Sequence, residues 1–119
     1  PEDIVEHQAL MQGSETWQFM DGDNVVTVHP QGRFKADNGT ALIAAAVAGL
    51  GIAYLPVNLA LDHVRTGALI PIMTDYPPPP AGAYVIRPPG QHPARKIRIL
   101  TEILIEYFER HPDTLGRDR

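Results

Sequence analysis

One uncharged stretch, residues 39–61, constrains the fold of this chain more than any other part of the sequence. From Asp37 to Pro56 the chain reads DNGTALIAAAVAGLGIAYLP. Asn38 or Thr40 can cap a helix, and two glycines follow the alanine-rich run where that helix would end. A short apolar strand then runs up to the proline. Because residues 39–61 carry no charge, we expect this helix and strand to be buried on most sides.

Length and composition limit the classes of protein that the chain can represent. It has 119 residues, which is the size of one domain. Its net charge is −4 and its Lys and Arg residues are not clustered, which argues against electrostatic binding of nucleic acid. The lack of cysteine excludes disulfide scaffolds, cysteine-ligated metals and cysteine nucleophiles. The polar, acidic N-terminus is unlike a signal peptide, and the uncharged stretch contains too much Ala, Gly and Pro for a membrane span.

Local patterns predict a mixed α/β domain. The strands that we expect cover residues 8–11, 17–20, 25–28, 33–36, 51–55, 69–73 and 83–86, and the further helices cover residues 57–64 and 94–110. The first half is hairpin-like, whereas strands and helices alternate in the second half, which favours a mixed sheet. The four prolines from Pro77 to Pro80 form a loop or linker, since they cannot join a ladder. We expect Trp17, Phe19 and Tyr54 in the core.

The sequence offers little for catalysis. The five histidines are scattered without metal-ligand spacing, and Ser14, the only serine, lies outside a nucleophile-elbow motif. The glycines of Gly49-Leu-Gly51 follow a helix and open a strand, which is the reverse of a dinucleotide fingerprint. We therefore predict that the chain is not an enzyme and has no cofactor and no metal site.

The polar end of the alanine-rich helix is the candidate ligand site. The Asn38–Thr40 segment would present backbone N–H groups that bind carboxylates and phosphates, although the same residues would also serve as a simple helix cap. Leu55–Pro56 ends the next strand, and strand ends of this kind border ligand crevices in open α/β sheets. Arg33 and Lys35 lie nearby and could attract an acidic ligand, or they could be solvated strand charges. Both interpretations remain open at this point.

The order of these motifs resembles the C-terminal part of the effector-binding (substrate-binding) domain of LysR-type transcriptional regulators. The segments that carry the resemblance are Trp17–Phe19, Asp37–Gly39, Ala44–Pro56, Gly67–Pro71, Tyr84–Pro88 and the closing amphipathic helix with Arg95–Ile97 and Ile103–Phe108. They span nearly the whole chain.

The resemblance implies one lobe of a type II periplasmic-binding-protein-like fold with a mixed sheet, beside an incomplete second lobe. Residues 1–82 would form the lobe that comes second in the family. Residues 83–119 would supply a crossing strand and a C-terminal helix that belong to the family's first lobe. Most of that first lobe and the family's winged helix-turn-helix would be absent from this chain, and we expect the C-terminal helix to pack on a neighbouring chain or on its own lobe.

The resemblance also implies a function and a set of contact residues. A small, possibly anionic effector would bind in a cleft, and the candidate contacts are Phe34, Asp37, Asn38, Gly39, Thr40, Leu55, Pro56 and Ile86. The expected protein is a cytoplasmic homo-oligomer, a dimer or tetramer, that reaches DNA only through the absent helix-turn-helix and does not contact a membrane. The alternative is a lobe of a solute-binding protein that serves transport or signalling.

Overall fold

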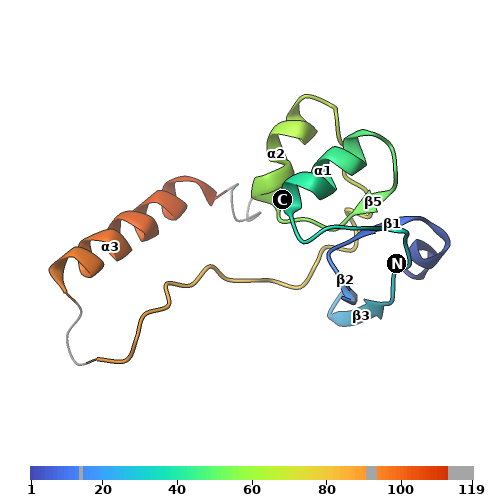
Figure 1. Ribbon diagram of the computed structural model, residues 1–119. Helices are drawn as coiled ribbons and strands as arrows, with labels where there is room; N and C mark the ends of the chain where they lie inside the picture. The colour runs from blue at the N-terminus through green and yellow to red at the C-terminus, as the bar shows by residue number, and fades with distance from the viewer. Residues whose placement is uncertain (14, 91–93, 113–119) are drawn as a thin grey trace. The chain divides into compact units, whose positions relative to one another are not determined.

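The structure is a computed structural model that describes residues 1–13, 15–90 and 94–112. The chain divides into two compact units, Pro1–Pro80 and Ala81–Arg119 (Figure 1). The helices and strands are a 3₁₀ helix at Glu2–Glu6, β1 (Ala9–Met11), β2 (Trp17–Asp21), β3 (Asn24–Val28), β4 (Phe34–Lys35), α1 (Gly39–Val47), β5 (Ile52–Ala53), α2 (Val57–Arg65) and α3 (Arg95–Arg110).

A three-stranded parallel sheet organises the first unit. Its order is β4-β1-β5, so the first strand in the sequence lies in the middle. Leu10 is paired with Phe34 on one side and with Ala53 on the other. All three residues of β1 are buried, as expected for a central parallel strand that is covered on both faces.

Glycines allow the chain to pass close to β1 on both sides. A Cβ atom at Gly32 would lie 1.8 Å from the carbonyl oxygen of Ala9, and one at Gly51 would lie 2.4 Å from the carbonyl oxygen of Gln8. The N–H of Ala9 donates to the carbonyl of Gln31 at 2.9 Å, so the backbones meet here directly. No other residue type fits either position without a backbone shift.

The sheet separates two hydrophobic clusters, because successive side chains of β1 point to opposite faces. Leu10 packs with Leu42 and Ala45 of α1 on the helical face. Ala9 and Met11 belong to the other cluster, whose further buried members are Ile4, Trp17, Phe19 and Val28. The second cluster is closed by a hairpin of β2 and β3.

The hairpin confirms the pattern that the sequence predicts. Trp17 pairs with Val28 and Asp21 pairs with Asn24, which leaves a two-residue turn. Gly22 opens that turn with a φ of +60°, a conformation in which glycine carries no steric penalty. Trp17 and Phe19 alternate with exposed Gln18 and are buried, so their predicted place in the core is confirmed.

The alanine-rich stretch forms α1 and β5 as predicted, but it is less buried than its lack of charge suggests. Gly49 ends the helix region with a φ of +79°. Leu42, Ile43 and Ala45 are buried, whereas Leu50, just after the helix, is 55% exposed. Alanine and glycine bury little surface, so an uncharged run of them does not require cover on every side. α2 follows at once and ends near Gly67, whose φ is +80°.

Two predicted strands are not formed. Residues 69–73 make no ladder among the described residues, because Pro71 lacks an N–H donor and Met73, with a φ of +56°, turns the chain back. Residues 83–86 also form no strand in the described part of the chain, where they have no neighbouring strand with which to pair. The proline segment is a loop as predicted, and its first carbonyl, that of Pro77, accepts a 2.7 Å hydrogen bond from the N–H of Met20.

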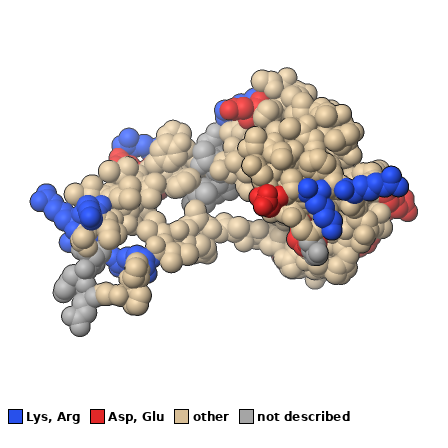
Figure 2. All heavy atoms as spheres, in the orientation of Figure 1, with Lys and Arg blue, Asp and Glu red and all other residues tan. Residues whose placement is uncertain are grey.

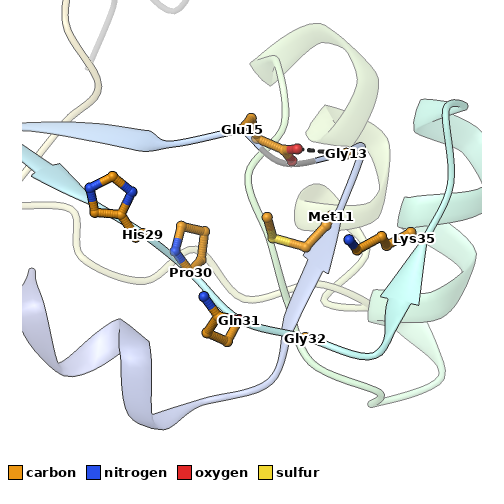
Figure 3. A pocket seen from close by; sticks show the side chains of 8 residues that line it. All are labelled: Met11, Gly13, Glu15, His29, Pro30, Gln31, Gly32 and Lys35. Atoms are coloured by element: carbon orange, nitrogen blue, oxygen red, sulfur yellow. Dashed lines mark hydrogen bonds between the residues drawn. The ribbon is translucent and has the colours of Figure 1, made fainter.

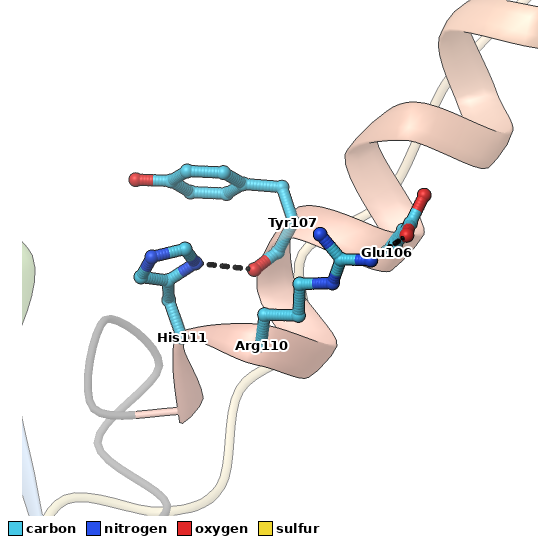
Figure 4. Close-up of polar contacts among 4 residues, drawn as sticks. All are labelled: Glu106, Tyr107, Arg110 and His111. Atoms are coloured by element: carbon cyan, nitrogen blue, oxygen red, sulfur yellow. Dashed lines mark hydrogen bonds and ion pairs between the residues drawn. The ribbon is translucent and has the colours of Figure 1, made fainter.

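The second unit contains α3, which matches the predicted C-terminal helix. Glu106 and Arg110 form an ion pair one turn apart, and the ring of Tyr107 stacks on His111 with centroids 4.4 Å apart (Figure 4). Much of the apolar side of the helix is exposed, with Leu100 and Ile103 among its members. No helix within residues 1–13, 15–90 and 94–112 has both the length and the apolar character that a bilayer crossing requires.

Candidate functional site

The three parallel strands end at one edge of the sheet, and the predicted site residues follow two of them. Because β1, β4 and β5 run in the same direction, their carboxyl ends lie together. The segment Ala36–Thr40 leads from β4 into α1, and Leu55–Pro56 leads from β5 into α2 (Figure 1). Crevices at such an edge bind ligands in open α/β folds.

The N-terminus of α1 is capped by the side chain of Asn38. The Oδ1 atom of Asn38 accepts hydrogen bonds from the N–H of Thr40 at 2.8 Å and from that of Ala41 at 3.4 Å. Asn38 is therefore the N-cap, and it satisfies the backbone N–H groups of Thr40 and Ala41. The sequence prediction treats free N–H groups at this helix start as donors to a ligand. A Cβ atom at Gly39 would lie 2.9 Å from Cδ1 of Leu59, so the start of α1 packs closely against α2.

The other predicted residues divide into supporting and exposed ones. Phe34 and Leu55 are half-buried against the cluster on the helical face and position the two loops. Asp37 and Pro56 are exposed, and Pro56 occupies the N-cap position of α2. The first unit thus brings seven of the eight predicted residues to one sheet edge. Ile86 lies in the second unit and is 91% exposed.

Glu15, in the loop after β1, was missed by the sequence reasoning. Its two carboxylate oxygens accept hydrogen bonds from the N–H of Gln12 at 2.7 Å and from the N–H of Gly13 at 2.6 Å. Desolvation acts to raise the pKa of this carboxyl, but the hydrogen bonds from Gln12, from its own N–H and from Gly13 outweigh it, so the pKa lies below its ordinary value.

A small hollow of about 220 Å³ opens beside this loop (Figure 3). It is lined by Met11, Gly13, Glu15, His29, Pro30, Gln31, Gly32 and Lys35. Met11 and Lys35 are the last residues of β1 and β4, so the hollow lies at the carboxyl edge of the sheet. They alternate with Leu10 and Phe34, which face the helices, and the hollow therefore lies on the hairpin side of the sheet.

The hollow contains charges of both signs. Lys35 forms no ion pair within the described residues, although Glu15 lines the same hollow. The face of the Pro1–Pro80 unit that Figure 2 shows carries a few basic side chains with acidic ones on both sides of them. This surface therefore carries charges of both signs. In the hollow, the unpaired ammonium group of Lys35 and the hydrogen-bonded carboxylate of Glu15 line the same space.

Tyr54, at the end of β5, connects the site edge to the core. Its ring stacks on Trp17 with centroids 5.5 Å apart and meets Phe19 edge-on at 5.7 Å. Its hydroxyl donates to the carbonyl of Gln18 at 3.0 Å, and burial raises the pKa of the phenol. The prediction placed this ring in the core, but the residue is 37% exposed because it lies where the strand leaves the sheet.

The described residues hold no cluster of three or more His, Cys, Asp or Glu side chains that could bind a metal ion. Of the five histidines and the single serine, none of which stands in a catalytic pattern in the sequence, His92 and Ser14 lie outside the described residues.

Comparison with known proteins gives one family. A family model described as the LysR substrate binding domain matches residues 1–109. A protein of Pseudomonas aeruginosa that is named as a transcriptional regulator is 29% identical over 98% of this chain. The HTH-type transcriptional activator AaeR of Escherichia coli K12 is 28% identical over 66% of the chain. The chain spans 40% of the length of the first relative and 26% of the second.

Proposed function

The chain belongs to the LysR substrate-binding domain family, and from this premise we propose that it senses a small effector within a longer bacterial transcription regulator. The family implies a type II periplasmic-binding-protein-like fold, and the chain has the mixed α/β composition of such a fold, with one parallel and one antiparallel sheet. The names of the relatives support a regulator over a solute-binding protein that serves transport.

In the proposed architecture, residues 1–82 form the second lobe of the effector-binding domain. Residues 83–119 cross back to the first lobe, where residues 83–86 gain a strand partner and α3 covers a sheet with its apolar side. The division of the chain near Pro80 supports this assignment. So do the many exposed apolar side chains of α3, because helices with one apolar face are normally covered.

The single observation that carries the proposed site is the common edge at which β1, β4 and β5 end. We assign the effector contacts of this lobe to Phe34, Asp37–Thr40 and Leu55–Pro56, and those of the crossing segment to Ile86. The side chain of Asn38 already accepts hydrogen bonds from the backbone N–H groups of Thr40 and Ala41, so an effector at the start of α1 would compete for these two donors. The hydroxyl group of Thr40, which is exposed, is the contact that we propose there.

Effector binding is proposed to shift the population of lobe and subunit arrangements in a homo-oligomer. A helix-turn-helix elsewhere in the intact protein would read DNA, and the domain itself would catalyse no reaction. The proposed location is the cytoplasm, where the DNA target lies.

The test uses the intact protein. A thermal-shift screen of small carboxylates and aromatics identifies an effector, and calorimetry then compares the wild type with Thr40→Val and with the matched control Thr27→Val. Thr27 is an exposed threonine of β3, so the control makes the same chemical change away from the site. We expect Thr40→Val to weaken binding about five- to tenfold through the lost hydrogen bond, and Thr27→Val to leave it unchanged. Equal affinities for both variants would refute the site.

A further inference from the structure

We infer that the hollow at the ends of β1 and β4 selects a small monocarboxylate with a hydroxyl or amino group at its other end. This inference rests on the proposed function, since it names the chemical class of the effector. It rests on Lys35 and Glu15, which line the hollow on the hairpin side of the sheet and are not among the eight contacts that the sequence predicts.

The cationic side of the hollow is Lys35. Its ammonium group has no ion-pair partner within the described residues, and it lies on the last residue of an edge strand. An unpaired ammonium group in a concave site favours an anionic ligand group, and a carboxylate is the smallest common organic anion that matches it. Gly13 lines the same hollow without a side chain, and a Cβ atom there would meet only Oε2 of Glu15 at 3.7 Å, so a ligand can approach the backbone at this point.

The anionic side of the hollow is Glu15. Each of its carboxylate oxygens accepts one backbone N–H, which fixes the group and leaves further lone pairs for a ligand donor. A second ligand carboxylate would be repelled at this position, which argues against dicarboxylates. A hydroxyl or ammonium group would be bound, and this is the chemistry that hydroxy acids and amino acids share.

Two apolar side chains line the hollow among its polar and charged neighbours. They are Met11 and Pro30, and both residues are buried (Figure 3). A short carbon chain between the two polar ends of a ligand would contact these side chains. A volume of about 220 Å³ is small for a ligand pocket and suits a compact molecule of three to six carbons.

The experiment is calorimetry on the intact protein with unbranched carboxylates of three to six carbons. Each length is tested in three forms: the plain acid, the acid with a terminal hydroxyl and the acid with a terminal amine. Butanoate, 4-hydroxybutanoate and 4-aminobutanoate are the four-carbon members. Comparison of the hydroxyl forms with the amine forms shows which of the two groups donates to Glu15.

We expect at least one donor-bearing acid to bind more tightly than the plain acid of the same length. Lys35→Met should weaken that binding at least tenfold, and Lys35→Arg should restore much of it. Arg33→Met is the matched control, because it removes the same charge two residues away from a side chain that does not line the hollow. Glu15→Gln should reduce the advantage of the donor-bearing acid over the plain acid.

Two results would overturn the inference. One is that no acid of the series binds; the other is that Lys35→Met and Arg33→Met have equal effects. If another effector is found whose affinity depends on Thr40, the proposed sensing function stands while this inference fails. If neither the series nor the wider screen yields a ligand, both fail.

Discussion

Replacing Gly32 by alanine is expected to destabilise the parallel sheet by about 2 to 3 kcal/mol. The added Cβ atom would lie 1.8 Å from the carbonyl oxygen and 2.7 Å from the carbonyl carbon of Ala9. Both atoms belong to the backbone of the central strand, so no flexible side chain can move aside. The segment before β4 must therefore move away from β1.

Three contributions give this magnitude. Forcing a methyl group into a packed region costs about 1–3 kcal/mol. The 2.9 Å hydrogen bond from the N–H of Ala9 to the carbonyl of Gln31 lies beside the clash, and losing it adds about 1 kcal/mol. The smaller freedom of alanine in the unfolded chain offsets about 0.4–1 kcal/mol of that total.

Thermal denaturation of the intact protein, followed by circular dichroism, measures the effect. A loss of 2 to 3 kcal/mol corresponds to a melting temperature lower by about 10 to 20 °C for a lobe of this size. Gly90→Ala is the matched control, since a Cβ atom there meets nothing within 4 Å and the φ of Gly90 is not positive. If the two variants melt within about 2 °C of each other, the close approach at Gly32 is not as described.

Two further predictions concern the loops at the sheet edge. Asn38→Ala should lower the free energy of unfolding by about 1 kcal/mol through loss of the α1 cap, whereas Asn38→Ser should stay within a few tenths of wild type in urea denaturation. Equal losses for both would contradict the capping role. Glu15 has a lowered pKa, so its stabilisation is present above the pKa of the unfolded chain and is lost as the pH falls through the folded pKa. Glu15→Gln should therefore flatten the acid side of the melting-temperature profile between about pH 7 and pH 3, and an unchanged profile would argue against the hydrogen bonds to this carboxylate.

Elements with local signals could be predicted from the sequence. The helix after Asn38 has a cap residue, the hairpin around Gly22 has a turn glycine, and the C-terminal helix has an apolar face at helical spacing. These signals act over a few residues and do not depend on distant parts of the chain. The observed boundaries lie within a few residues of the predicted ones.

The two strands that failed to form show where local reasoning ends. Residues 69–73 and 83–86 are rich in β-forming side chains, but a strand exists only when a neighbour supplies the hydrogen bonds. Within the described residues both sheets form without these two segments. The identity of a partner strand cannot be read from the segment itself.

The site could be predicted only in part. The loop after β4 was predicted as a contact because its polar residues lie next to a helix start, and its role stays a prediction. Glu15 and the hollow near Lys35 were not found, because they depend on the parallel pairing of Met11 with Lys35, residues 24 positions apart in the sequence. The effector cleft is what the family resemblance implies, whereas the hollow and its two charged groups depend on the three-dimensional pairing.

The central position of β1 has a kinetic consequence. Among the strands of its sheet, β1 is synthesised before both of its neighbours, and β5 pairs with it only when residues 52–53 are available. Closing so long a loop costs chain entropy before any ladder bond forms, which slows folding. The hairpin can form earlier, because its strands are joined by two residues. On a ribosome, the side of β1 that pairs with β5 therefore stays unpaired until more than forty further residues have left the exit tunnel, which leaves this side of the strand open to chaperones.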